Sequence, residues 1–195
     1  MGRSATVTRQ TKETDITVTL DLDGTGSISG ATGVPFFDHM LEAFGRHGLF
    51  DLRVNAVGDL AVDAHHTVED VGICIGQGIA QALGDKAGIR RFGSAVVPMD
   101  EALVLAAVDI SGRGQLHYDV AVPIELIGTF DTTLAKEFMV ALATNAGATV
   151  HVRALAGENA HHIIEAAFKA LARALRQACK PDPRVSGIPS TKGNL

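Results

Sequence analysis

The octapeptide DAHHTVED at residues 63–70 has a close counterpart in NAHHIIEA at residues 159–166. Each opens a helix-like pattern of apolar residues, which continues to about residue 84 in the first case and to about residue 179 in the second. Core packing can account for a repeated leucine or isoleucine, but not for a repeated pair of imidazoles with a carboxylate at fixed spacing. The repeat therefore indicates two related halves that share a chemical task.

Two further segments repeat in the same order. ETDITVTLDLDGTG, from Glu13, is similar to EALVLAAVDISGRG, from Glu101, and FFDHMLEAFGRHGLFDLRV, from Phe36, is similar to KEFMVALATNAGATVHV, from Lys136. We therefore divide the chain into a first half (1–92), a second half (93–180) and a C-terminal tail (181–195).

Each half shows apolar strand-like runs, then a helix, a strand and a longer second helix, which is a ββ(β)αβα unit. Ile16, Val18 and Leu20 alternate before Asp23-Gly24, which predicts a strand with one buried face entering a hairpin. A first helix follows, with Gly48 as its stop signal and an apolar stripe at Phe37, Met40, Leu41 and Phe44. We predict the α+β class, with two pseudo-symmetric halves that each place two helices on one face of a small mixed sheet.

Composition excludes several classes of protein. The chain has 195 residues, 46% of them hydrophobic, which is enough for a real core. Its net charge of -5 offers no basic surface for nucleic acid. The polar N-terminus and the lack of a long apolar run predict no membrane segment, so we expect a soluble cytoplasmic protein. Cys74 and Cys179 lie in apolar helical patterns without C-x-x-C spacing, which predicts core residues.

The spacing within each motif indicates two metal ions rather than one. On a helix His65 and Glu69 lie on one face, whereas His66 is rotated by about 100° and points elsewhere. Repeat symmetry then gives each ion one His/Glu pair from one motif and the remaining histidine of the other. One ion is then predicted to bind His161, Glu165 and His66, and the other is predicted to bind His65, Glu69 and His162.

A fourth ligand for each ion should come from the shorter helix of each half. Aligning the strands that follow places His39 opposite Glu137, one for each ion. Imidazole and carboxylate without thiolate favour manganese or iron, with zinc or cobalt possible. A single structural zinc ion is the rival arrangement, but closed structural sites usually employ cysteine, and eight candidate ligands exceed what one tetrahedral ion needs.

These residues resemble a known family. FFDHMLEAFGRHGLFDL, DAHHTVEDVGICIG, HHIIEAAFKALARALRQA and the terminal SGIPSTKGNL together look like imidazoleglycerol-phosphate dehydratase, over essentially the whole chain and without an added phosphatase region, as in the monofunctional form. The resemblance implies fused ββ(β)αβα halves, two manganese ions per active site, and a homo-oligomeric shell of twenty-four subunits with active sites at subunit contacts. At position 137 many relatives carry His where this chain has Glu137.

The resemblance also implies a reaction. The enzyme would be a hydro-lyase of histidine biosynthesis that removes water from D-erythro-imidazole glycerol phosphate and gives imidazole acetol phosphate. No carbonyl acidifies the hydrogen that is removed. Two ions that each bind one ring nitrogen would convert the ring to a metal-bound imidazolate and so stabilise the developing charge.

By the same resemblance, Arg91, Arg113, Ser190 and Lys192 hold the phosphate. The other substrate-binding residues are His47, Lys169 and Thr191, and the tail folds over the substrate. The resemblance also implies that Glu13 reaches the substrate as base or acid, with a neighbouring subunit as one source of this residue, and that Asp100 is a weaker candidate. The residues alone leave alternatives open. The GRG around Arg113 also fits a plain hairpin turn, Arg90 rivals Arg91, and acidic residues at strand ends are common on protein surfaces.

Two other functions remain as alternatives. A two-metal hydrolase would use the same ligands but would release phosphate from the substrate. The second alternative is a binding module without enzymatic activity, because a similar half-domain shape also occurs in RNA-associated proteins. The acidic charge and the doubled ligand set argue against that module.

Overall fold

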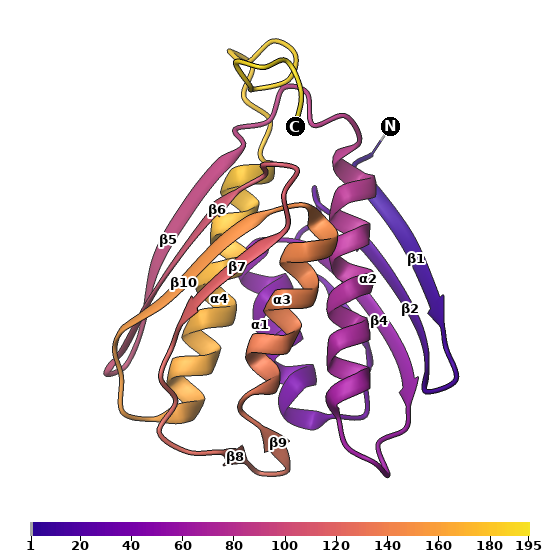
Figure 1. The fold of residues 1–195 in the computed structure, drawn as a ribbon, viewed down its shortest axis with the longest axis vertical. Coiled ribbons are helices and arrows are strands. Elements are labelled where there is room, and N and C mark those ends of the chain that lie inside the picture. The colour runs from indigo at the N-terminus through magenta and orange to yellow at the C-terminus, as the bar shows by residue number, and fades with distance from the viewer. Residues whose placement is uncertain (1) are drawn as a thin grey trace.

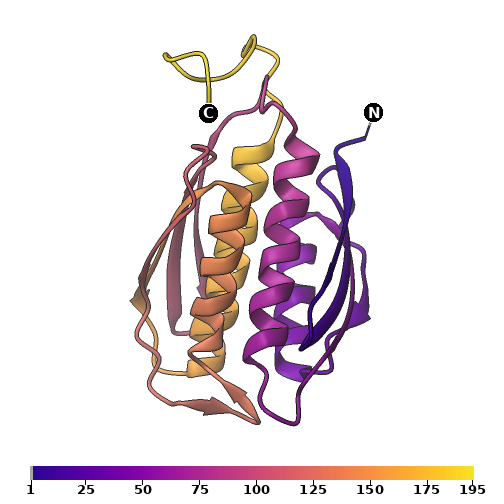
Figure 2. The ribbon, with the colours of Figure 1, turned by 45° about the vertical axis from the view of Figure 1, so that its right-hand side comes forward.

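The computed structural model describes residues 2–195, in which four helices lie between two sheets, one pair of helices against each sheet (Figure 2). The first half contains β1 (Ser4–Gln10), β2 (Thr14–Asp21), β3 (Ile28–Ala31), α1 (Pro35–Gly48), β4 (Asp51–Gly58) and α2 (His65–Leu83). The second contains β5 (Phe92–Met99), β6 (Ala102–Asp109), β7 (Gln115–Asp119), α3 (Leu134–Ala146), β10 (Thr149–Ala156) and α4 (Ala160–Cys179). A short hairpin of β8 (Leu126–Ile127) and β9 (Phe130–Asp131) is inserted before α3.

The two four-stranded sheets have the same topology, β1-β2-β4-β3 and β5-β6-β10-β7. The interior strands are β4 in the first sheet and β10 in the second. β4 is antiparallel to β2 and parallel to β3, and β10 is antiparallel to β6 and parallel to β7. The predicted α+β class and the repeat of the strand–helix order are therefore confirmed.

The predicted hairpin at Asp23-Gly24 is wrong. After this turn the chain enters β3, which pairs with β4 and not with β2. The Asp51 carboxylate at the start of β4 explains the difference, because its Oδ1 accepts the backbone N–H groups of Thr25 and Ser27, each at 2.8 Å, and holds this loop beside β4. The hairpin in this sheet joins β1 to β2 instead.

A single hydrophobic core spans both halves, and the helices pair across them. α2 packs against α3, and α1 packs against α4. Close approach of α2 to α3 depends on Gly72 and Gly76, since a Cβ at these positions would lie 2.7 Å from the Phe138 carbonyl oxygen and 2.6 Å from that of Leu142. This pairing places each histidine motif beside the shorter helix of the other half.

Both cysteines are core residues, as predicted. Cys74 and Cys179 are free thiols with 0% and 2% exposure. Burial raises the pKa of the Cys74 thiol to about 11 and that of Cys179 to about 12, so neither is a reactive thiolate.

The helices have two distinct ends, one beside the hairpin turns and one beside the C-terminal tail. α2 and α4 begin at one end, beside the β1–β2 and β5–β6 turns, and finish at the other, where the tail lies (Figure 1). The tail is anchored there by backbone hydrogen bonds of 2.8 Å between Asp182 N and Gly88 O and between Gly88 N and Gly187 O. α4 has 20 residues and is therefore about 30 Å long. None of the helices formed by residues 2–195 combines the length and the apolar character needed to cross a membrane.

Candidate metal centre

His39, His161 and Glu165 form a compact group between α1 and α4. The Oε2 atom of Glu165 lies 3.2 Å from His39 Nε2 and 3.0 Å from His161 Nε2. Among residues 2–195 this is the one group of three potential ligands whose ligating atoms all lie within 4.8 Å of one another. Glu165 is buried while the two imidazoles are partly exposed, so the group opens toward the surface. Two imidazole nitrogens and a carboxylate oxygen at this spacing fit a divalent metal ion.

Lys169 forms an ion pair with the carboxylate of this group. Its Nζ lies 2.7 Å from Glu165 Oε1, one helical turn along α4. Burial by itself would raise the pKa of Glu165, but the hydrogen bond and charge of Lys169, with a smaller effect of His39, lower it overall. The nearby His47 has a lowered pKa because it is partly buried and faces the cations Lys169 and Arg173. Glu165 is therefore ionised, the form that ligates a metal ion.

The repeat-equivalent group of His65, Glu69 and Glu137 lies at the start of α2 and α3. These side chains are not brought together as closely as the group around Glu165. His65 instead lines an open hollow of about 440 Å³ between the beginnings of α1, α2 and α3. The two predicted sites are thus not equally formed within one chain.

The two histidines of the second motif contact different groups. His161 Nε2 lies 3.0 Å from Glu165, whereas His162 Nδ1 lies 2.8 Å from Glu101. The ring planes are inclined by 83° for His65 and His66 and by 75° for His161 and His162. Neither His66 nor His162 belongs to the group around Glu165. The predicted combination of His66 with His161 and Glu165 is therefore not present within a single chain.

A carboxylate holds the inner nitrogen of each of these two imidazoles. His66 Nδ1 lies 3.0 and 3.2 Å from the two oxygens of Asp59, and His162 Nδ1 lies 2.8 Å from Glu101 Oε2. The hydrogen bonds to Asp59 and Glu101 raise the pKa of His66 and His162, respectively. The same bond, with backbone donors, lowers the pKa of Glu101 to about 2. The Nε2 atom of each ring makes no hydrogen bond with another group of residues 2–195.

The two predicted acid–base residues, Glu13 and Asp100, lie near the Nε2 atoms of these two rings. Glu13 Oε2 is 3.9 Å from His66 Nε2, and Asp100 Oδ2 is 3.7 Å from His162 Nε2. Glu13 occupies the hairpin turn between β1 and β2, and Asp100 occupies the turn between β5 and β6. Their side chains are largely exposed. The sequence analysis did not predict the contact of Asp59 with His66 or that of Glu101 with His162. The alignment of Glu101 with Glu13 was a signal that could have pointed to Glu101.

The predicted phosphate-binding residues lie at the opposite end of the helices. Arg91 donates through Nε and Nη2 to Asp109, at 2.7 and 3.2 Å, and through Nη1 to the carbonyl oxygen of Pro189 in the tail, at 2.9 Å. Its guanidinium is thus already engaged within the chain, and it joins the tail to β6. Its rival Arg90 lies 3.9 Å from Asp182.

Arg113 lies in the β6–β7 connection, and the two strands are not neighbours, so the GRG segment is not a hairpin turn. The backbone carbonyl carbon of Leu195 packs against the GRG segment, 2.4 Å from the position that a Cβ on Gly112 would occupy. In the tail, Ser190 Oγ accepts the N–H of Lys192 at 3.2 Å, and the side chains of Thr191 and Lys192 are exposed. Because α4 separates these residues from the histidine motifs by about 25–30 Å, one small substrate cannot touch both ends of the same chain.

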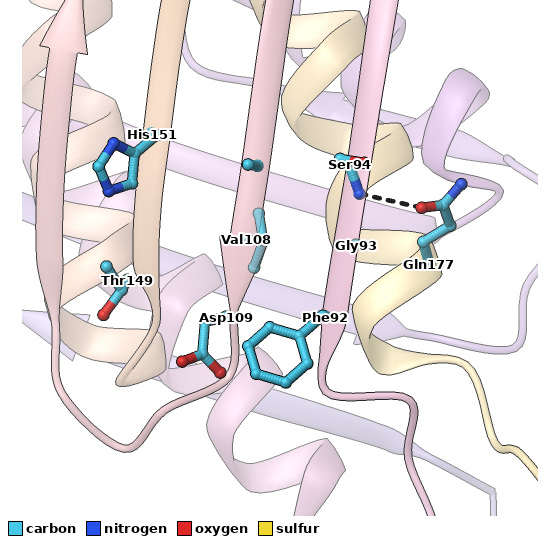
Figure 3. Close-up of a pocket in the computed structure, with 9 residues that line it drawn as sticks. Phe92, Gly93, Ser94, Val108, Asp109, Thr149, His151 and Gln177 are labelled. Atoms are coloured by element: carbon cyan, nitrogen blue, oxygen red, sulfur yellow. Dashed lines mark hydrogen bonds between the residues drawn. The ribbon is translucent and has the colours of Figure 1, made fainter.

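A further hollow of about 400 Å³ lies on the outer face of the second sheet, among Phe92, Asp109, Thr149 and His151 (Figure 3). Gln177 closes the nearby sheet edge, where its Oε1 accepts the backbone N–H of Ser94 at 2.9 Å. This hollow is on the far side of the sheet from the helices and contains none of the metal-ligand candidates.

Comparison with known proteins gives a consistent result. Residues 32–175 match the family model described as imidazoleglycerol-phosphate dehydratase. A relative of that name from Dinoroseobacter shibae is 61% identical over 99% of this chain and all of its own length, and one from Moorella thermoacetica is 58% identical over the full length of both. The Staphylococcus aureus dehydratase structure has a TM-score of 0.84 at 38% identity, covering 92% of this chain and 99% of that one. The structure from Pyrococcus furiosus, described as a complex with (S)-C348, has a TM-score of 0.83 at 43% identity, covering 97% and 100%.

Proposed function

This chain belongs to the imidazoleglycerol-phosphate dehydratase family, and we propose that it performs its dehydration with two metal ions held between copies of the chain. As a member it is a hydro-lyase of histidine biosynthesis that acts on a small phosphorylated imidazole. The observation that supports the proposal is the division of the site residues between two ends of the helices. The histidine motifs lie at one end, and the arginines and the tail lie at the other.

We assign one ion to His39, His161 and Glu165, completed by His66 of another copy. The repeat assigns the other ion to His65, Glu69 and Glu137, completed by His162 of another copy. The donor chemistry of both sets fits a divalent ion, and we propose manganese, with iron, cobalt or zinc as substitutes. Two such ions would supply Lewis acidity that stabilises negative charge on the imidazole ring and so favours loss of the hydroxyl from the carbon that bears the ring.

The remaining steps depend on side chains of the protein. We propose that Glu13, beside His66 Nε2, moves the proton at the reacting carbon or at the departing hydroxyl, with Asp100 as its less favoured counterpart in the other half. His47 and Lys169 border the metal group on the substrate side. Water leaves as the proton and the hydroxide removed from adjacent carbons.

We propose that the phosphate is bound by the other end of a neighbouring copy. Arg113 and the tail residues Ser190, Thr191 and Lys192 supply a cation, backbone N–H groups and hydroxyls for it. Arg91 either turns toward the phosphate or, in the arrangement seen here, keeps the tail in place through Pro189. A closed homo-oligomer, for which we propose twenty-four subunits, brings the two ends together repeatedly. Because phosphate esters do not cross membranes unaided, we propose that the enzyme works in the cytoplasm, where its substrate is made.

The first experiment adds manganese and imidazole glycerol phosphate to metal-depleted protein and measures the acetol product and free phosphate separately. Acetol product that appears only with metal supports the two-metal dehydratase. Free phosphate would instead indicate the hydrolase, and metal-independent dehydration would refute the role of the ions.

A complementation experiment tests the shared site. His39→Ala removes a ligand at one end of the chain, and Arg113→Ala removes a cation at the other. Each variant alone should be inactive, but protein assembled from both together should recover part of the activity, because some sites combine two intact ends. Absence of recovery in mixed assemblies, with assembly verified by size, would refute the division of the site between copies.

A further inference from the structure

The carboxylates of Asp59 and Glu101 have no part in the ligand sets above, yet each holds the Nδ1 of a motif histidine. Asp59 lies in the loop between β4 and α2, and Glu101 lies in the β5–β6 turn. An ionised carboxylate only accepts hydrogen bonds, so Nδ1 of the bonded ring carries the proton. Nε2 then keeps its lone pair, which is the atom that a metal ion needs.

The two halves reach this arrangement with residues that are not repeat equivalents. Glu101 aligns with Glu13, but Glu13 lies on the Nε2 side of His66, whereas Glu101 lies on the Nδ1 side of His162. The connection that supplies Asp59 runs over residues 59–64 between β4 and α2, while only residues 157–159 join β10 to α4. The shorter connection has no acidic side chain on His162 Nδ1, and Glu101 takes that place.

Glu101 is fixed by more contacts than Asp59. Its Oε1 accepts the backbone N–H groups of Glu158 and Asn159, at 3.2 and 2.8 Å, which leaves Oε2 for His162. Asn159 in turn caps α4, since its Oδ1 accepts the N–H of His161 at 2.9 Å. Within residues 2–195, the Asp59 side chain makes hydrogen bonds to His66 alone.

We propose that Asp59 and Glu101 are positioning residues, which fix His66 and His162 in the tautomer that offers Nε2 to a metal ion and thereby leave Glu13 as the free carboxylate of the repeat pair. The inference rests on the proposed two-metal function. It gives the repeat-equivalent glutamates different tasks. Glu101 orients a ligand, and Glu13 faces the substrate.

Because the Glu101 side chain is held by more hydrogen bonds than that of Asp59, we expect replacement of each carboxylate by its amide to have different effects on metal binding. In Glu101→Gln the amide oxygen stays with the two backbone N–H groups, so the amide nitrogen faces His162 Nδ1 as a donor. The ring must then carry its proton on Nε2, where it blocks the metal. In Asp59→Asn the amide can turn its oxygen to His66 and keep the tautomer, whereas Asp59→Ala cannot.

The test measures manganese binding by metal-depleted, assembled protein, with the free ion followed by its electron paramagnetic resonance signal. Wild type should bind two ions per chain. Glu101→Gln should weaken one of them by about 10- to 100-fold, Asp59→Ala should weaken one by a similar factor, and Asp59→Asn should bind nearly as wild type. Asp63→Asn and Glu158→Gln remove one charge from the same loops and serve as matched controls without loss of affinity.

Melting of the metal-free variants shows whether each is folded, and the Asp59 pair decides the matter if Glu101→Gln is unstable. Two ions bound normally by both Glu101→Gln and Asp59→Ala would overturn the positioning role but not the proposed function. Equal weakening by Asp59→Asn and Asp59→Ala would also overturn it, because charge and not the tautomer would then be responsible. Wild type that binds no ion would overturn both proposals.

Discussion

Replacement of Lys169 by methionine tests how the metal group is held before an ion binds. Lys169 Nζ is 2.7 Å from Glu165 Oε1, and the two side chains are only 18% and 8% exposed. Methionine keeps most of the apolar volume but leaves a buried carboxylate without its cation. Removing one partner of a buried ion pair costs about 3–5 kcal/mol.

We expect a lower cost here, because Lys169 is partly hydrated and His39 and His161 both contact the Glu165 carboxylate. An estimate of about 2–3 kcal/mol follows. For a chain of this length about 1 kcal/mol changes the melting temperature by roughly 2–4 °C, so metal-free Lys169→Met should melt about 4–12 °C below wild type. Manganese should reduce this difference, because a bound cation replaces the missing ammonium beside Glu165.

Thermal melting of both proteins, with chelator and with manganese, gives the comparison. Arg173→Met is the matched control, since it removes the same charge from an exposed position on α4 and should change the melting temperature little. A Lys169→Met deficit that is equal with and without manganese would refute the electrostatic role of Lys169. An unchanged melting temperature in chelator would refute the cost assigned to the unpaired carboxylate.

Other predictions concern separate parts of the molecule. Glu13→Gln should lower turnover by about 10²- to 10⁴-fold while manganese binding stays unchanged, and equal activity would exclude Glu13 as acid or base. Gly93→Ala should lower the urea midpoint by the equivalent of about 1–3 kcal/mol, because the added Cβ would lie 2.0 Å from the Ala174 carbonyl oxygen; a wild-type midpoint would show that α4 can move away from β5. Hydrogen bonds from Arg184 and the charge of Arg90 lower the pKa of Asp182. Arg90 lies outside the tail, 3.9 Å from Asp182, so the contribution of this ion pair to tail anchoring is present above the ordinary carboxyl pKa and is lost as the pH falls through the lowered one. Proteolysis of the tail should therefore accelerate in acid for wild type, and Asp182→Asn should be cleaved rapidly already at neutral pH.

The sequence predicted the local elements well because their signals are local. Alternation in β2 and the 3.6-residue stripes of α1 and α4 depend only on which residues lie on one face. The prediction failed at Asp23-Gly24, where a turn signal was read as a hairpin. Strand pairing after a turn depends on distant partners, here the carboxylate of Asp51, which no local pattern contains.

By itself, therefore, the sequence determined that the chain consists of two similar halves, that each has a His-His-x-x-Glu motif, and that neighbouring imidazoles of a motif diverge. These follow from repetition and from the pitch of a helix. Only the tertiary structure decided that His39 joins the motif of the other half, that Asp59 and Glu101 hold His66 and His162, and that Arg91 holds the tail through Pro189. Those contacts join residues 7 to 126 positions apart, and their distances depend on how helices and sheets pack, which side-chain spacing along one element does not specify.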